Sequence, residues 1–215
     1  MQVISINVGE LRTIPRRGHQ IKTGIFKQPI EGTIAVQSHG LDGDAQGDLT
    51  LHGGTEKAIY VYPKEHYKYW GKKFPELNLS WGIFGENLTI EGASEDTVYI
   101  GDQWQIGSAK FEVVEPREPC YKLGVSVGNK KIVKQFSESG RSGWYLRVIQ
   151  EGEIKPSDTI SVLNKNIHTV TVTDLNNFFS HTLKDMATLQ RALQIETLSQ
   201  KWRDSITQYL QRSKT

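Results

Sequence analysis

The chain has 215 residues, of which 37% are hydrophobic and 23% charged, and this composition excludes a disordered polar chain and a bundle of membrane helices. Its 26 basic and 24 acidic side chains leave a net charge of +2, too little to attract nucleic acid or an anionic membrane through the charge of the whole molecule. The single cysteine excludes an internal disulfide and any metal site built only from cysteines.

Short runs of β-branched and aromatic residues, separated by turn residues, predict strands in the N-terminal part of the chain. Gly101-Asp102 is expected to form a tight hairpin turn between two of them. So many short strands predict a β-barrel. The strands are expected at residues 3–8, 33–37, 87–90, 97–100, 103–106, 111–114, 144–149 and 159–163.

Short helices are predicted at residues 64–70, directly after Pro63, and at 130–138. All 20 glycines and all 7 prolines precede residue 160, so a boundary is predicted between a domain at 1–165 and a domain at 166–215. In the second domain, helices are expected to begin near Thr173, after a cap at Asp185, and near Thr197. Their apolar stripes predict packing against one another, the barrel or a second subunit.

No apolar run reaches the roughly 18 residues that a membrane-spanning helix requires. The N-terminal residues alternate like a strand and do not resemble a targeting segment. We therefore expect a cytoplasmic protein that does not enter a membrane.

The densest cluster of unusual residues surrounds the only cysteine, in the stretch from Pro116 to Leu123. Pro116 and Pro119 restrict the backbone before the thiol, and Arg117 and Lys122 flank Cys120. Neighbouring cations favour a thiolate, so a lowered pKa and metal ligation are both plausible chemistry for this segment. The alternative is that Cys120 is a small buried hydrophobic residue.

Three further motifs carry side chains suited to binding or catalysis. In His52-Gly53-Gly54, followed by Lys57, paired glycines permit close backbone approach to a phosphate, although the same glycines also suit a plain turn. Glu86-Asn87 and Arg141 lie in two other glycine-containing stretches, where they also suit a turn carboxylate, a turn cap and a surface cation. Loops of this kind, carried on one rigid barrel, commonly form binding sites.

Taken in order, five motifs resemble the MOSC domain family, which is named after the C-terminal domain of molybdenum cofactor sulfurase. With the glycine-free tail, the whole chain resembles its YiiM-like subgroup. The resemblance implies a fold that is mainly β with short helices, a MOSC-type closed β-barrel followed by a small three-helix domain. The motifs are His52-Gly53-Gly54, Phe84-Gly85-Glu86-Asn87-Leu88, Gly101-Asp102, Pro116-Arg117-Glu118-Pro119-Cys120 and Gly143-Trp144-Tyr145.

The resemblance also implies a cofactor and a reaction. It implies molybdenum cofactor (Mo-pyranopterin) with Cys120 as the protein ligand to the metal, and reduction of N-hydroxylated compounds such as 6-N-hydroxylaminopurine by removal of oxygen from N–OH. One soft thiolate suffices, because the pterin dithiolene supplies two sulfurs. His52 and Glu86 are the candidate proton donors, with Cys120 as the third catalytic residue. The residues expected to bind the cofactor are His52, Gly53, Gly54, Lys57, Asn87, Arg117, Cys120 and Arg141.

The chain has no cysteine set for an iron–sulfur cluster and no flavin fingerprint, so the reaction requires an electron-donating reductase as partner. Two alternatives are open for the helical tail: it is the docking surface for this reductase, or its apolar stripes form the interface of a homodimer. A carrier of molybdenum cofactor, or of persulfide sulfur on Cys120, without substrate turnover is the alternative function. Nucleic-acid binding by the tail is not expected, because Glu196 and Asp204 interrupt its basic residues.

Overall fold

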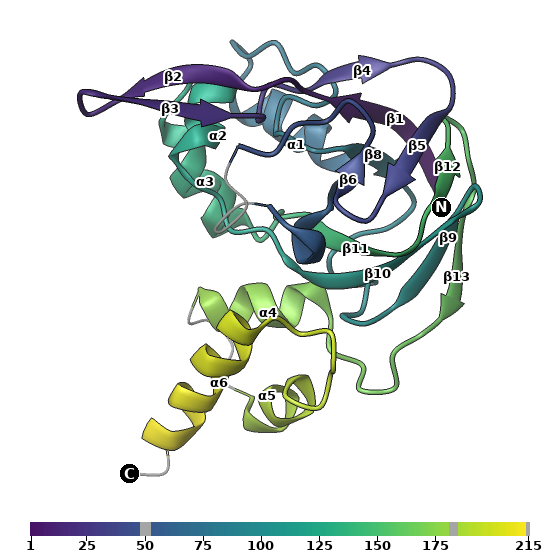
Figure 1. Cartoon of the computed structure of the whole chain (residues 1–215). Coiled ribbons are helices and arrows are strands. Elements are labelled where there is room, and N and C mark those ends of the chain that lie inside the picture. Colours follow the sequence, from purple (N-terminus) through teal and green to yellow (C-terminus); the bar gives the residue numbers. More distant parts are fainter. Residues whose placement is uncertain (48–52, 181–184, 214–215) are drawn as a thin grey trace.

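The fold is built around a large mixed sheet (Figure 1). The computed structural model describes residues 1–47, 53–180 and 185–213. Buried and partly exposed residues alternate along strands such as β9, because successive side chains point to opposite faces of a sheet. The strands of this sheet are β1 (Gln2–Val8), β4 (Gln28–Ile30), β7 (Ile59–Pro63), β8 (Leu88–Glu91), β9 (Gln103–Ile106), β10 (Ala109–Pro116), β11 (Trp144–Gln150) and β13 (Ile160–Asn164).

The strands lie in the order β13-β9-β10-β11-β7-β8-β1-β4, and β7 and β8 are parallel neighbours. Their connection contains α1 (Glu65–Lys73), as expected because parallel strands need a long crossover. The pairing places Val61 opposite Leu88. It also brings the backbone N–H of Tyr60 to within 3.0 Å of the Asn87 side-chain oxygen. The crossover thereby joins two segments that are distant in sequence.

The expectation of a closed β-barrel is wrong. Within the residues that the structure describes, no ladder joins the edge strands β13 and β4. The sheet does curl, because Gln2 at the start of β1 forms a bridge with Thr159, just before β13. The second half of β1 pairs with β4 instead, where Ile6 lies opposite Ile30. Because β4 takes that side of β1, β13 does not continue along it and the sheet stays open.

Two smaller β structures accompany the large sheet. β12 (Gly152–Ile154), β5 (Ile34–Gln37) and β6 (Gly40–Leu41) form a three-stranded sheet. β2 (Arg12–Arg16) and β3 (His19–Thr23) form a two-stranded ribbon that projects from the body at the upper left of Figure 1. The ribbon turns at Arg17-Gly18, whose φ angles of 46° and 80° suit the twist of a tight hairpin. Of these strands, the sequence predicted β5.

The helices between the strands follow the sequence prediction in part. α1 matches the helix predicted after Pro63, and α3 (Lys131–Ser139) matches the one predicted at 130–138. The short turn η1 (Thr55–Lys57) and α2 (Tyr121–Val127) were not predicted. α2 begins directly after Cys120, so the last part of the stretch from Pro116 to Leu123 is helical.

Three helices occupy the described part of the C-terminal region, as predicted: α4 (Val172–Phe179), α5 (Met186–Ala192) and α6 (Gln200–Arg212). The predicted cap at Asp185 is confirmed, because its carboxylate accepts from the N–H of Ala187 at 3.1 Å. No helix in the described ranges combines the length and the apolar character needed to cross a bilayer. The domain boundary at 165/166 stays a prediction.

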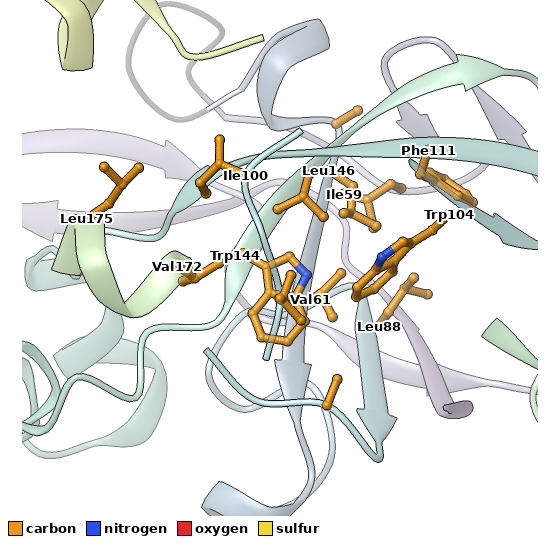
Figure 2. Packing of buried hydrophobic residues seen from close by; sticks show 14 of the residues in the cluster. Ile59, Val61, Leu88, Ile100, Trp104, Phe111, Trp144, Leu146, Val172 and Leu175 are labelled. Carbon is orange, nitrogen blue, oxygen red and sulfur yellow. The ribbon is translucent and has the colours of Figure 1, made fainter. Parts of the chain in front are cut away.

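A single buried hydrophobic cluster runs from the large sheet into the three C-terminal helices. At its centre the rings of Trp104 and Trp144 meet edge to face, with centroids 5.8 Å apart. Figure 2 shows Val172 and Leu175 of α4 beside the residues of the sheet. The apolar stripes of the tail therefore pack against each other and against the sheet. A second, aromatic-rich cluster lies among α1, α2, α3 and β7.

The strand predicted at 97–100 does not form, so the hairpin predicted at Gly101-Asp102 is absent as well. The backbone of this segment bonds instead to the chain around the start of α4. Ile100 donates to the carbonyl of Val170 at 2.9 Å, and Val98 accepts from Val172 at 3.0 Å. The sequence did not predict β7. All its residues are buried, so its sequence does not show the alternation of polar and apolar residues that indicates a strand.

Replacing Ile206 by alanine tests whether α6 belongs to the common core. Ile206 is fully buried in the large cluster, so Ile206→Ala should lower the free energy of unfolding by about 2–5 kcal/mol through lost burial and cavity formation. Gln208→Ala, an exposed position on the same helix, should change it by less than about 0.5 kcal/mol. Urea denaturation measures both, and similar effects of the two variants would contradict the packing described.

Candidate functional site

Cys120 lies between the end of β10 and the start of α2. β10 ends at Pro116 and α2 begins at Tyr121, with Cys120 at the capping position. Pro116 and Pro119 restrict the backbone between these elements. The Cys120 side chain makes no capping hydrogen bond, and the residue is half-buried. The thiol is thus neither used by the helix nor sealed in the core.

The thiol lines a cavity that is partly open to solvent and encloses about 90 Å³. Segments that are far apart in sequence form its wall: the end of β3 and the chain after it, the chain after β6, η1, the starts of β7 and β11, the chain before β8, and the Cys120 segment. The lining residues are Thr23, Gly24, Ile25, Lys27, Asp44, Ala45, Gln46, Gly47, Lys57, Tyr60, Gly85, Asn87, Arg117, Glu118, Cys120, Lys122 and Tyr145.

Arg117 is the most deeply placed cation of this wall. Its residue is 6% exposed, and its guanidinium donates to the carbonyl of Phe84 at 2.6 Å. It also lies over the ring of Tyr60, 4.6 Å from the centroid. Burial alone would lower the pKa of Arg117, but electrostatic interactions with Tyr60, Tyr145 and Cys120 raise it above its ordinary value. Arg117 therefore keeps its charge next to Cys120.

Positive charge exceeds negative charge in this lining. Lys122 is 7% exposed, and neither it nor Arg117 forms an ion pair with any residue of the described ranges. Lys27 and Lys57 are paired, with Asp44 at 2.5 Å and with Glu115 at 3.2 Å. Two cations beside the thiol are thus left without a carboxylate. Such a cavity suits an anion, because burying an unpaired charge is costly unless a ligand compensates it.

Asp44 ties three of the wall segments together. Its carboxylate accepts from Lys27 at 2.5 and 2.7 Å, from the backbone N–H of Gly9 at 2.9 Å and from Asn87 at 2.8 Å. Burial lowers the pKa of Lys27, and the pairing with Asp44 opposes that shift. Close packing supports the same junction, since a Cβ at Gly24 would lie 1.8 Å from the Ala45 carbonyl oxygen. This side of the cavity is therefore rigid.

Two tyrosines contribute neutral hydroxyls. Burial raises the pKa of Tyr145 to about 12 and also raises that of Tyr60, so both phenols stay protonated at neutral pH. Tyr60 donates its hydroxyl to the carbonyl of Ser142 at 2.7 Å. The Tyr145 ring packs on Tyr60 with centroids 5.4 Å apart. Tyr145 is thus a neutral hydroxyl in the cavity wall.

The structure brings together four of the residues predicted to form the site. Lys57, Asn87, Arg117 and Cys120 all line the cavity. Gly54 of the glycine loop does not line the cavity itself but contacts a residue that does. Its N–H donates to the side-chain oxygen of Gln46 at 2.8 Å, and Gln46 is part of the lining. Gly53 precedes Gly54 and is not part of the lining. His52 lies outside the described residues, so its predicted role stays a prediction.

Glu86 does not line the cavity. It is fully buried, and one of its carboxyl oxygens accepts from Gly82 N–H at 2.9 Å, from Thr89 at 3.0 Å and from the Tyr67 hydroxyl. Its other oxygen has no hydrogen-bond partner within the described part of the chain. Burial raises the pKa of Glu86 and these hydrogen bonds oppose the shift. These hydrogen bonds connect the Glu86 carboxyl to the surrounding buried residues. Its role in proton transfer stays a prediction.

Arg141 also lies away from the cavity lining. Its guanidinium is 3.9 Å from the centroid of the Tyr69 ring and donates to the carbonyl of Ser139 at 3.2 Å. These contacts fit the surface-cation alternative, and its predicted role in cofactor binding stays a prediction.

Sequence reasoning missed several lining residues. Tyr145 could have been predicted. It follows Trp144, a predicted core residue, on one strand, and successive side chains of a strand point to opposite faces. Lys122 was noted beside Cys120 but not assigned to the site. Lys27 and Asp44 carry no local signal, since their pairing joins positions 17 residues apart.

The helical tail reaches the same segment from outside the cavity. Glu115, which pairs with Lys57, also accepts from the hydroxyl of Ser199 at the start of α6. Lys201 on α6 pairs with Glu118. Two contacts thus connect α6 to the residues that precede Cys120.

The chain matches two family models. The MOSC domain matches residues 48–161, and the YiiM-like, 3-alpha helix domain matches residues 170–212. Uncharacterized protein YflK from Bacillus subtilis is 37% identical over 203 residues, covering 94% of this chain and 91% of the relative. A protein named reductase from Gibberella moniliformis is 37% identical over 151 residues, which are 69% of this chain and 27% of that relative.

The crystal structure of YiiM from Geobacillus stearothermophilus is similar over 97% of this chain and 98% of its own length. Its TM-score is 0.81 at 31% sequence identity. The likeness therefore extends over both the sheet and the three C-terminal helices.

Replacing Glu86 by glutamine tests its buried state through the pH dependence of stability. The pKa is raised on folding, so above its ordinary value of 4.5 the unfolded chain releases a proton that the folded protein retains. This carboxyl therefore costs the wild type stability as pH rises. The free energy of unfolding of Glu86→Gln, measured by urea denaturation, should improve relative to wild type from about pH 4 to about pH 8.

The exposed residue Glu10 provides the matched control, because Glu10→Gln removes the same charge from the surface. This control should show no such trend. A difference between Glu86→Gln and wild type that stays constant with pH would contradict the raised pKa.

Proposed function

Because the chain belongs to the MOSC domain family and carries a YiiM-like three-helix domain, we propose that it is a molybdenum-cofactor-dependent reductase of N-hydroxylated compounds. MOSC is a molybdenum-cofactor-related domain family, and one relative is named reductase. In this proposal Cys120 is the protein ligand to the metal. Compounds of the hydroxylaminopurine type are the substrates.

The observation that carries the proposal is the half-buried thiol of Cys120 in a cavity with unpaired positive charge. Molybdenum cofactor has a soft metal–sulfur end and an anionic phosphate. Among the described residues of the lining, Cys120 alone carries a sulfur atom, and this thiol suits the soft end. Within the described ranges no group of three His, Cys, Asp or Glu side chains is arranged to hold a metal ion.

The cations of the wall suit the anionic end of the cofactor. Arg117 and Lys122 have no carboxylate partner in the described ranges and are held near Cys120 by burial, so they can neutralise anionic oxygens without prior loss of an ion pair. Lys27 and Lys57 are each paired with a carboxylate, so the unpaired positive charge of the wall comes from Arg117 and Lys122. The residues present therefore fit the group.

The net reaction converts R–NH–OH, two electrons and two protons into R–NH₂ and water. The N–O bond breaks, the nitrogen is reduced, and the oxygen leaves as water. When bound, the cofactor would supply the two-electron chemistry of this step. The protein must orient the N–O bond, limit the access of bulk water and hold protons nearby.

The chain provides groups for those tasks. Tyr145 stays protonated at neutral pH, because burial raises its pKa to about 12, and its hydroxyl is available to hydrogen-bond a departing oxygen. The Lys122 ammonium presents further N–H donors in the same wall. His52 and Glu86 remain the proton donors predicted from sequence. Glu86 would have to act through intervening groups, because it does not line the cavity.

Replacing Cys120 by serine tests the ligand assignment. A hydroxyl is a poor donor for a soft metal site, so Cys120→Ser should lower bound molybdenum from about one atom per chain to a small fraction of that value. Reduction of hydroxylaminopurine with reduced methyl viologen should fall with it. Elemental analysis and product chromatography measure the two quantities.

Val125→Ser provides the matched control, because Val125 is exposed on α2, the helix that follows Cys120. It should keep its molybdenum and its activity. Cofactor-loaded wild-type protein that retains molybdenum through Cys120 yet never converts the substrate would favour the carrier function instead. Full activity of Cys120→Ser would contradict both functions.

Replacing Lys122 by methionine tests the anion site. Methionine keeps much of the apolar length and removes the charge, so Lys122→Met should weaken cofactor binding about tenfold, as expected for one lost charge-assisted hydrogen bond. The rate of cofactor release measures the effect. Lys131→Met, on the exposed face of α3, should release cofactor as wild type does. Equal release from the two variants would argue against a role for Lys122.

A further inference from the structure

The β2–β3 ribbon carries an unbalanced positive charge. Residues 11–30 include no Asp or Glu. Arg12, Arg16, Arg17 and Lys22 are all exposed, and none of them forms an ion pair with a described residue. Because the net charge of the whole chain is +2, subtracting these four cations leaves a net charge of −2 on the rest of the chain. The molecule is therefore polarised toward the ribbon.

The ribbon is attached to the body through one of its faces. Ile14 lies opposite Ile21 in the register and is 6% exposed, so this face is covered. Arg12 and Arg16 share that face, and their guanidinium groups lie over the rings of Phe26 and Tyr121, at 5.2 and 3.8 Å. Arg17 and Lys22 remain exposed at the turn and on the other face. The cations are thus presented by an anchored element.

The base of the ribbon adjoins the Cys120 cavity. β3 ends at Thr23, and Thr23, Gly24 and Ile25 line the cavity. Tyr121, under the guanidinium of Arg16, is the residue that follows Cys120. Figure 1 shows the ribbon passing over α2, the helix that Tyr121 begins, and extending beyond the body. A partner held by the ribbon would therefore lie beside the cavity.

Three cations of the helical tail are already engaged. Lys201 pairs with Glu118, and Arg203 donates to the carbonyls of Leu193 at 2.8 Å and Leu198 at 3.0 Å. Arg191 donates to the carbonyl of His168 at 3.2 Å. These contacts hold the tail together, so the tail offers an acidic partner less available charge than the ribbon does.

We propose that the β2–β3 ribbon is the docking surface for an acidic electron-carrier protein, which it holds beside the cavity of Cys120. This inference rests on the proposed function, because the reduction of an N–O bond consumes two electrons that this chain must obtain from a donor. Complementary charge speeds encounter and fixes the orientation of two proteins. A long nucleic acid would have to extend beyond the ribbon onto a molecule whose other residues carry a net negative charge, which favours a compact acidic protein.

A binding experiment tests the docking surface without any need for cofactor. The probe is purified flavodoxin, a small acidic flavin protein, titrated into the full chain at low and at high salt and followed by calorimetry. Wild type should bind flavodoxin. The double variant Arg17→Gln/Lys22→Gln should bind more weakly, with a Kd about tenfold higher at low salt. Raising the salt should weaken wild-type binding toward that of the variant, because exposed charges are screened.

Lys68→Gln/Lys155→Gln is the matched control, since it removes the same charge from exposed positions on α1 and after β12. It should bind flavodoxin within about twofold of wild type, because steering depends on where the charge lies. Failure of wild type to bind flavodoxin, or equal weakening in both double variants, would overturn the proposal. So would ribbon-dependent binding of a short DNA duplex more tightly than flavodoxin.

An activity measurement separates this inference from the proposed function. Cofactor-loaded wild type and both double variants should reduce hydroxylaminopurine equally with methyl viologen, a small cationic donor that needs no docking. With reduced flavodoxin, the ribbon variant alone should be slower. Ribbon-dependent flavodoxin binding without turnover from either donor would refute the proposed reduction and leave the docking surface supported.

Discussion

The site depends on a buried guanidinium that has no carboxylate partner in the described ranges. Arg117 is held by the Phe84 carbonyl and the face of Tyr60, contacts that fix its position but do not cancel its charge. Leaving a charge in this state costs several kcal/mol relative to a paired one. The fold offsets that cost through the hydrophobic cluster behind the site. The arrangement provides positive potential beside Cys120, which follows Arg117 by three residues in the sequence.

The cavity is pre-organised because its wall is joined by contacts between distant segments. The parallel pairing of β7 and β8 brings Tyr60 to Asn87, and Asn87 in turn donates to Asp44. Asp44 also holds Lys27, so a lysine that burial would tend to neutralise is kept near a compensating carboxylate. A ligand entering this cavity meets donors whose positions are already fixed, and it loses less free energy in ordering them.

The sequence predicted features that local patterns determine. The cap at Asp185 and the three tail helices depend on neighbouring residues, and the structure shows each of them. Features that depend on distant contacts escaped prediction. The pairing of β1 with β4 keeps the sheet open, and the segment at 97–100 bonds to the start of α4 rather than forming a strand. The pair of Lys27 and Asp44 in the site belongs to the same class.

The Cys120 segment is contacted from both ends of the chain, and this explains why the tail and the ribbon both bear on one site. On the N-terminal side, Arg16 of the ribbon covers Tyr121. On the C-terminal side, α6 contacts Glu115 and Glu118 through Ser199 and Lys201. Because Glu115 also pairs with Lys57, the first turn of α6 helps to fix a cation of the cavity wall. The tail is therefore a structural support of the site, which leaves the ribbon as the exposed charged surface beside the thiol.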